Sequence, residues 1–286
     1  MSRSDVYLTV TNRIIEAIEQ GTVPWRKPWV GGGPVNVRNG RPYRGINIFL
    51  LGLMAYNDPR WGTFKAVKES GGNVRQGEKA THVILWKPVK KRNPAEDESD
   101  SYLLLKTYAV FNAEQCDDLP AMETGDEVVP LDAAESVVTG YIGPTIAHGK
   151  GMAAYSQTLD LVAMPSTSSF LSTEGYYSTL FHELVHSTGH KDRLDRLESG
   201  GFGTGPYAKE ELVAEMGAAM LCGVAGIENL DQSSAYISGW LDALKRDPKL
   251  VVQAAAQAQK ACDLMLGTKF NEPSQDSEMA KEVVAA

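Results

Sequence analysis

The feature that most constrains this chain is a pair of histidines four residues apart, His182 and His186, with Glu183 directly after the first. On an α-helix, positions i and i+4 lie on one face about one turn apart, so both imidazoles can reach one metal ion. In hydrolases with this spacing, the histidines bind zinc and the glutamate takes a proton from a metal-bound water. The motif therefore predicts a zinc site with Glu183 as its catalytic residue.

The residues around this motif favour a buried helix over about 173–189. The flanking positions are apolar, and Gly189 follows as a helix stop. The chain has five histidines, and three of them fall within nine residues, at positions 182, 186 and 190. This context supports a metal site over a chance pattern.

A catalytic zinc ion usually takes three protein ligands and leaves one position open. Asp192 stands where the metzincin motif places its third ligand. Glu211 begins the stretch Glu-Leu-Val-Ala-Glu, which resembles the gluzincin pattern, where a second helix supplies a glutamate. In that pattern the acidic residue four positions on, here Glu215, supports a metal-binding histidine without binding the metal itself.

We favour Glu211, because 207–222 has the composition of a helix. Asp192 lies in the charged run 191–196, which is typical of a surface loop. His190 is a weaker candidate, since it follows Gly189. The alternative for Glu211 and its acidic neighbours is a solvated helix face.

Composition and charge indicate a protein of two parts without a membrane segment. No apolar run approaches the roughly 18 residues of a membrane span, and the N-terminus lacks the apolar core of a signal peptide. The three scattered cysteines do not suggest a disulfide framework, so we expect a cytoplasmic protein. Residues 1–93 carry 16 Lys/Arg and 6 Asp/Glu, whereas 94–286 carry 12 and 30. The basic part suits a polyanionic partner.

We expect an α+β fold. We expect residues 1–115 to form a small α/β domain with an antiparallel sheet and residues 116–130 to form an acidic linker. We expect residues 131–268 to form a mostly helical metal-binding domain, and residues 269–286 to be a disordered tail. Four of the five tryptophans lie in the basic part. Aromatic rings among cations suit single-stranded nucleic acid, because bases stack on the rings while cations follow the phosphates. The candidate DNA-binding residues are Trp25, Arg26, Lys27, Trp29, Arg41, Tyr43, Arg44, Asn47, Trp61, Lys65, Lys68 and Lys79.

The chain resembles the ArdC-type antirestriction proteins of conjugative plasmids over about residues 4–266. The resemblance rests on the stretch from Ile15 to Trp29, the segment Pro42-Tyr-Arg-Gly-Ile-Asn47, the motif His182–His190 and the segment Glu210–Glu215. It implies an N-terminal single-stranded-DNA-binding domain and a C-terminal SprT-like, zincin-type metallopeptidase domain. It also implies a role in shielding incoming plasmid DNA from host restriction during conjugation, and it supports Glu211 as the third ligand.

These observations leave three classes of function. The first is a binding protein that coats the entering strand or occupies a host restriction enzyme. The second is a DNA-dependent metalloprotease that degrades a DNA-bound host protein. The third, a metal-dependent nuclease, ranks last because nucleases usually prefer carboxylate-rich Mg²⁺ sites. We expect Zn²⁺ at the site, with Mn²⁺ or Co²⁺ as alternatives, single-stranded DNA as the partner, and no membrane partner.

Overall fold

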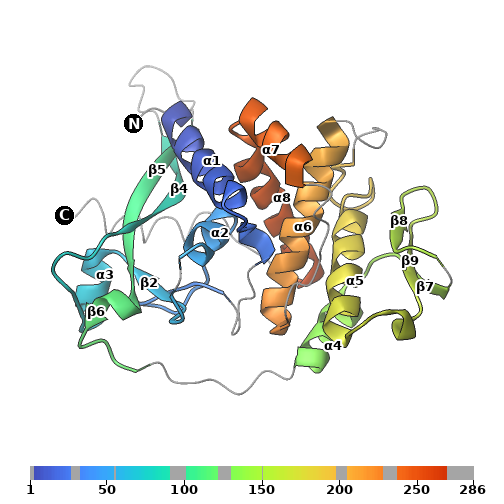
Figure 1. Ribbon diagram of the computed structural model, residues 1–286, viewed down its shortest axis with the longest axis horizontal. Helices are drawn as coiled ribbons and strands as arrows, with labels where there is room; N and C mark the ends of the chain where they lie inside the picture. The colour runs from blue at the N-terminus through green and yellow to red at the C-terminus, as the bar shows by residue number, and fades with distance from the viewer. Residues whose placement is uncertain are drawn as a thin grey trace.

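The computed structural model describes residues 3–26, 33–54, 56–90, 101–121, 130–149, 151–197, 205–227 and 237–268. The expected tail at 269–286 lies outside these ranges. The chain combines helices and sheets, which confirms the α+β class (Figure 1). The helices are α1 (Arg3–Glu19), α2 (Ile46–Gly52), α3 (Phe64–Glu69), α4 (Pro130–Gly140), α5 (Thr173–Thr188), α6 (Gly205–Ala225), α7 (Ile237–Arg246) and α8 (Leu250–Met265).

The strands fall into two groups that belong to different parts of the chain. The N-terminal part holds β1 (Val35–Asn36), β2 (Arg60–Gly62), β3 (Asn73–Val74), β4 (Thr81–Lys90), β5 (Ser101–Asn112) and β6 (Cys116–Asp117). The C-terminal part holds β7 (Thr145–Gly149), β8 (Ala154–Ser156) and β9 (Leu161–Pro165). Short 3₁₀ turns lie at η1 (Pro24–Arg26), η2 (Ala113–Gln115) and η3 (Thr167–Ser169).

The N-terminal sheet has the strand order β1-β2-β5-β4 and is built on a long antiparallel hairpin. Strand β4 pairs with β5 in a register that runs from Thr81 opposite Val110 to Lys90 opposite Ser101. The antiparallel sheet expected in this part is therefore present. Helix α3 begins after Thr63, whose side-chain oxygen accepts a hydrogen bond from the backbone N–H of Ala66 and so caps the first turn.

The C-terminal part places the expected metal helix, α5, between a small sheet and α6. The sheet has the order β7-β9-β8, which leaves β8 at an edge. Helices α5 and α6 approach closely at Gly217, where an added Cβ would lie 2.7 Å from Cγ2 of Val185. A larger residue at position 217 would push the two helices apart, so this glycine sets their spacing.

One hydrophobic core runs through both parts of the chain. Helix α1 lies beside α7, and α6 and α8 occupy the middle of the molecule (Figure 1). The core includes Ile14 and Phe49 from the N-terminal part together with Trp240 and Val251 from the C-terminal part. Polar contacts join the same surfaces, since the Thr11 hydroxyl donates to the carbonyl of Pro248 at 2.6 Å.

The predicted linker at 116–130 is described in part, and its central residues, 122–129, lie outside the described ranges. The domain boundaries stay a prediction, but the continuous core shows that the two parts pack against each other. Within the described part of the chain, no helix has the length and apolar character needed to span a bilayer.

Candidate metal centre

Helix α5 brings His182 and His186 together on one face, as the i and i+4 spacing predicts. Ser172 begins the helix, because its side chain accepts a hydrogen bond from the backbone N–H of Gly175. The Nε2 atoms of the two imidazoles lie 3.1 Å apart. Apolar residues on the other faces of α5 bury the helix and fix where both rings point.

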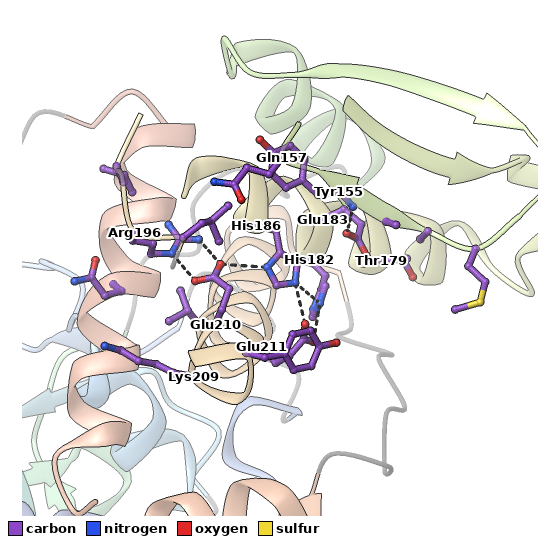
Figure 2. A pocket seen from close by; sticks show the side chains of 18 of the residues that line it. Tyr155, Gln157, Thr179, His182, Glu183, His186, Arg196, Lys209, Glu210 and Glu211 are labelled. Atoms are coloured by element: carbon purple, nitrogen blue, oxygen red, sulfur yellow. Dashed lines mark hydrogen bonds and ion pairs between the residues drawn. The ribbon is translucent and has the colours of Figure 1, made fainter. Parts of the chain in front are cut away.

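Helix α6 supplies the third group, Glu211, from across the α5–α6 contact (Figure 2). Its Oε1 lies 3.5 Å from Nε2 of His186, and its Oε2 lies 3.6 Å from Nε2 of His182. Among the residues that the structure describes, these three form the cluster that could hold a metal ion, with ligand atoms within 4.8 Å of one another. Asp192 lies outside it: its side chain is 74% exposed, and Oδ2 lies 3.4 Å from Nδ1 of His190.

The charges around the histidine pair suit a cation. Burial by itself lowers the pKa of His182, but a hydrogen bond to Glu211 and the charges of Glu215 and Glu183 raise it to about 9. Burial raises the pKa of Glu211, but His182 and His186 outweigh it and lower that pKa. Two imidazoles and one carboxylate in a negatively charged site fit a divalent metal ion of borderline softness.

Glu183 does not join the three clustered side chains but faces the same pocket. Its Oε2 accepts a hydrogen bond of 2.7 Å from the backbone N–H of Tyr155, in the edge strand β8. Figure 2 shows its side chain beside Tyr155, apart from Glu211. Glu215, predicted to support a histidine, is buried one turn beyond Glu211 on α6, and its charge acts on His182.

A pocket of about 1440 Å³ opens over this centre. The small sheet and the segment after it line one wall, with Met152, Ala154 and Phe170. The opposite wall comes from α6 and α8, with Lys209 and Lys260. The histidine pair and Glu183 line the same pocket.

The prediction that the charged run 191–196 is a surface loop is wrong in part. The side chains of Arg193 and Arg196 are only 12% and 8% exposed. Arg196 makes two hydrogen bonds of 2.9 Å to the carboxylate of Glu210. Alternation of arginine and aspartate in that run is compatible with solvation or with internal ion pairs, and local sequence cannot separate these.

Glu210 is a site residue that sequence reasoning missed. Its Oε1 lies 3.1 Å from Nδ1 of His186. Burial raises the pKa of Glu210, but hydrogen bonds from His186 and Arg196 outweigh this and lower it. The signal in the sequence was its position directly before Glu211, although a helix places neighbouring residues about 100° apart, which argued against a shared site.

The structure corrects the predicted exposure of several aromatic residues. Trp25 is 0% exposed and packs edge-to-face against Phe49 and Trp240. Tyr43 and Trp61 are buried together in a second apolar cluster. These rings pack in the core, so in this conformation they offer no face on which a base could stack.

Two of the remaining DNA-binding candidates, Asn47 and Arg44, are half-buried and make contacts with distant parts of the chain. The Asn47 side chain bonds both backbone groups of Ile84, and Arg44 pairs with Asp263 of α8. Exposed or half-buried candidates are Arg41, Lys65, Lys68 and Lys79. The Arg26 side chain and the whole of Lys27 and Trp29 lie outside the described residues. Phe64, which sequence reasoning missed, is 60% exposed at the start of α3.

Comparison with known families agrees with this geometry. The family described as zincin-like metallopeptidase matches residues 132–257, which contain α5 and α6. The family described as the N-terminal domain of anti-restriction factor ArdC matches residues 4–111. The fold and site therefore define a protein with a zincin-like metallopeptidase domain, a class whose centre takes a divalent metal ion.

Solved structures and sequence relatives extend over almost the whole chain. The metal-free crystal structure of antirestriction protein ArdC from plasmid R388 is 42% identical, with a TM-score of 0.78, and the match covers 92% of this chain and 97% of that one. The Mn(II)-bound structure has a TM-score of 0.77 at the same identity, covering 93% and 98%. This chain belongs to the ArdC-type antirestriction proteins.

Two DNA primases named TraC, from Escherichia coli, are each 36% identical over 282 residues. These matches cover 90% of this chain but only 26% and 19% of the primases. A protein of Sinorhizobium fredii named y4eC is 35% identical, with 92% of each chain covered. The same unit thus occurs as nearly a whole protein and as a minor part of much longer ones.

Proposed function

We propose that this antirestriction protein binds single-stranded DNA and protects incoming plasmid DNA from host restriction. We further propose that His182, His186 and Glu211 hold a divalent cation, Zn²⁺ first, with Mn²⁺ and Co²⁺ as alternatives. The convergence of these three side chains on one point carries the metal proposal. The Mn(II)-bound structure of the R388 protein supports a divalent cation in a protein of this fold.

The pocket residues suit peptide hydrolysis. A cation held there would supply electrophilic stabilisation of a carbonyl oxygen and lower the pKa of a water molecule. Glu183, fixed by the N–H of Tyr155, accepts the proton of the attacking water. It then delivers that proton to the amide nitrogen as the carbon–nitrogen bond breaks. The edge strand β8 thus orients the base beside the two imidazoles.

We assign the DNA-binding face to the surface formed by α3 and the turn after β1, and call it the α3 face. Its members are Arg38, Arg41, Phe64, Lys65 and Lys68. The turn lies against α3, because β1 pairs with β2 and Arg38 lies 3.4 Å from Glu69 of α3. Phe64 and Lys68 share one side of the helix, so an exposed ring stands one turn from a cation. This pairing suits base stacking combined with phosphate contact.

The experiment is a conjugation assay into a restricting host, with plasmids that encode the wild type, Glu183→Gln or Lys65→Glu/Lys68→Glu. We expect Glu183→Gln to protect the plasmid as the wild type does, and the double charge reversal to lose both strand binding and protection. Protection by a double variant that no longer binds DNA would contradict the proposal.

Loss of protection in Glu183→Gln alone would favour the second candidate, a DNA-dependent metalloprotease that degrades a DNA-bound host protein. The specific observation in favour of this candidate is the base, Glu183, held beside the clustered ligands in an open pocket. The DNA-binding variant serves as the common control, because both candidates require the α3 face.

A further inference from the structure

We propose that Glu210 and Arg196 are positioning residues for His186. Together they fix which ring nitrogen of His186 carries the hydrogen, and so direct the lone pair of Nε2 into the metal centre. This inference rests on the metal centre proposed above and adds two residues that its ligand set does not contain. It also gives a role to the charged segment after α5.

The first step concerns the contact between His186 and Glu210. Oε1 of Glu210 lies 3.1 Å from Nδ1 of His186. An ionised carboxylate can only accept a hydrogen bond, so this shorter contact favours the neutral tautomer that carries its hydrogen on Nδ1 and leaves Nε2 unprotonated. Nε2 is the atom that faces Glu211 at 3.5 Å. The bond to Glu210 therefore leaves a free lone pair at the point where the other ligand atoms converge.

The second step concerns the contacts that hold Glu210 in place. Arg196 binds its carboxylate with two parallel bonds, Nε to Oε2 and Nη2 to Oε1, each 2.9 Å long. This fork restricts both the position and the plane of a carboxylate. Arg196 also donates to the carbonyl of Val185 at 2.6 Å and to the hydroxyl of Thr188 at 2.7 Å. One guanidinium thus joins the last turns of α5 to the carboxylate on α6. Figure 2 shows Arg196 beside Glu210, which in turn faces His186.

The third step is the local backbone that brings Arg196 to this position. The backbone N–H groups of Arg196 and Leu197 donate to the carbonyl of Gly189, at 3.1 and 3.2 Å. A Cβ at Gly189 would lie 2.8 Å from Cγ of Leu197 and 3.2 Å from Cγ of Arg196. Glycine at this position allows the segment to fold back over the end of α5, so the glycine after the motif also serves to place Arg196.

The competing explanation for the Glu210–Arg196 pair is that it only holds α5 and α6 together. Replacing a buried ion pair with well-packed apolar side chains often leaves stability unchanged or raises it, so stability alone is a weak reason for this pair. The geometry has a more specific consequence, because the carboxylate contacts the ring nitrogen opposite the ligand atom. A carboxylate partner of this kind sets the ring orientation of metal-binding histidines and raises their basicity.

The experiment measures the tautomer of His186 in the metal-free full chain at pH 8 and, separately, Zn²⁺ and Mn²⁺ affinities by chelator competition. Long-range ¹H–¹⁵N spectra of histidine-labelled protein identify the protonated nitrogen. We expect the Nδ1–H form in the wild type, loss of that preference in Glu210→Ala, and affinities about 10–100-fold weaker in that variant. Asp192→Asn, which removes a carboxylate from the same segment, should change neither readout.

Two further variants separate positioning from folding. Glu210→Ala leaves Arg196 buried without its carboxylate, so Glu210→Gln, which retains an accepting oxygen, tests the same contact in a milder form. If Arg196 acts through Glu210, the double variant Arg196→Met/Glu210→Ala binds metal no more weakly than Glu210→Ala alone. Additive losses, an unchanged tautomer and affinity in folded Glu210→Ala, or a smaller remaining Nδ1–H preference in Glu210→Gln than in Glu210→Ala would overturn the inference. A wild type that shows the Nδ1–H form but binds no cation would contradict the proposed metal centre instead.

Discussion

Gly217 of α6 faces Val185 of α5 so closely that an added Cβ would lie 2.7 Å from Cγ2 and 2.9 Å from Cγ1 of the valine. Because these helices carry the clustered ligands, Gly217→Ala should both destabilise the fold by about 1–3 kcal/mol and weaken metal binding. Urea unfolding and chelator competition measure the two effects. Gly239→Ala is the matched control, since nothing lies within 4 Å of its added Cβ, and it should be neutral or stabilising.

Glu183→Gln should keep the metal affinity of the wild type and abolish any peptide hydrolysis. The amide cannot accept a proton from water, whereas the residue is not among the clustered ligands. Hydrolysis of a casein-type substrate and metal content of the same preparation are the measurements. Hydrolysis that persists in the purified variant would remove Glu183 from its catalytic role.

Phe64→Ala should weaken single-strand binding by about 1–3 kcal/mol with little change in unfolding free energy, because the ring is mostly exposed on the α3 face. Fluorescence anisotropy with a labelled oligonucleotide measures the affinity.

Trp25→Ala should lower the unfolding free energy by about 3–5 kcal/mol, since its ring lies in the core, and any loss of strand binding should follow from the loss of fold. A stable Trp25→Ala protein that has lost DNA binding would show that this ring reaches DNA.

The ionised side chain of Asp160 contributes to the unfolding free energy, and this contribution depends on pH. Hydrogen bonds from Arg193, together with one from the Tyr155 hydroxyl, hold the pKa of Asp160 at about 2 despite partial burial. Its ionised form is thus favoured by folding, and the contribution is complete above the unfolded pKa of about 3.9 and is lost as the pH falls toward 2. The difference in unfolding free energy between wild type and Asp160→Asn should shrink from pH 5 to pH 2. A constant difference over that range would contradict this assignment.

Much of the secondary structure followed from local patterns in the sequence. The apolar flanks of the motif predicted a buried helix at α5, and the spacing of His182 and His186 predicted that both imidazoles share one face of it. These features depend on neighbours within one or two turns, which is where helix periodicity carries information. The third member of the cluster, Glu211, required a pattern that spans two helices.

What sequence reasoning missed depends on contacts between distant segments. Trp25 was a candidate for stacking on a base, but Trp240, more than 200 positions away, packs against it in the core. Arg196 looked solvated, but the fold-back at Gly189 places it against Glu210. Exposure is a property of the packed molecule, and a short charged or aromatic run is compatible with either outcome.

The most direct test of the metal centre is the divalent-cation content and affinity of the full chain, compared among the wild type, Glu211→Ala and Asp192→Ala. We predict one equivalent of Zn²⁺ or Mn²⁺ in the wild type and in Asp192→Ala. Glu211→Ala should lose affinity by more than about 100-fold, beyond the effect typical of supporting residues. A wild type that binds no cation, or a loss in Asp192→Ala without one in Glu211→Ala, would contradict the assignment of His182, His186 and Glu211.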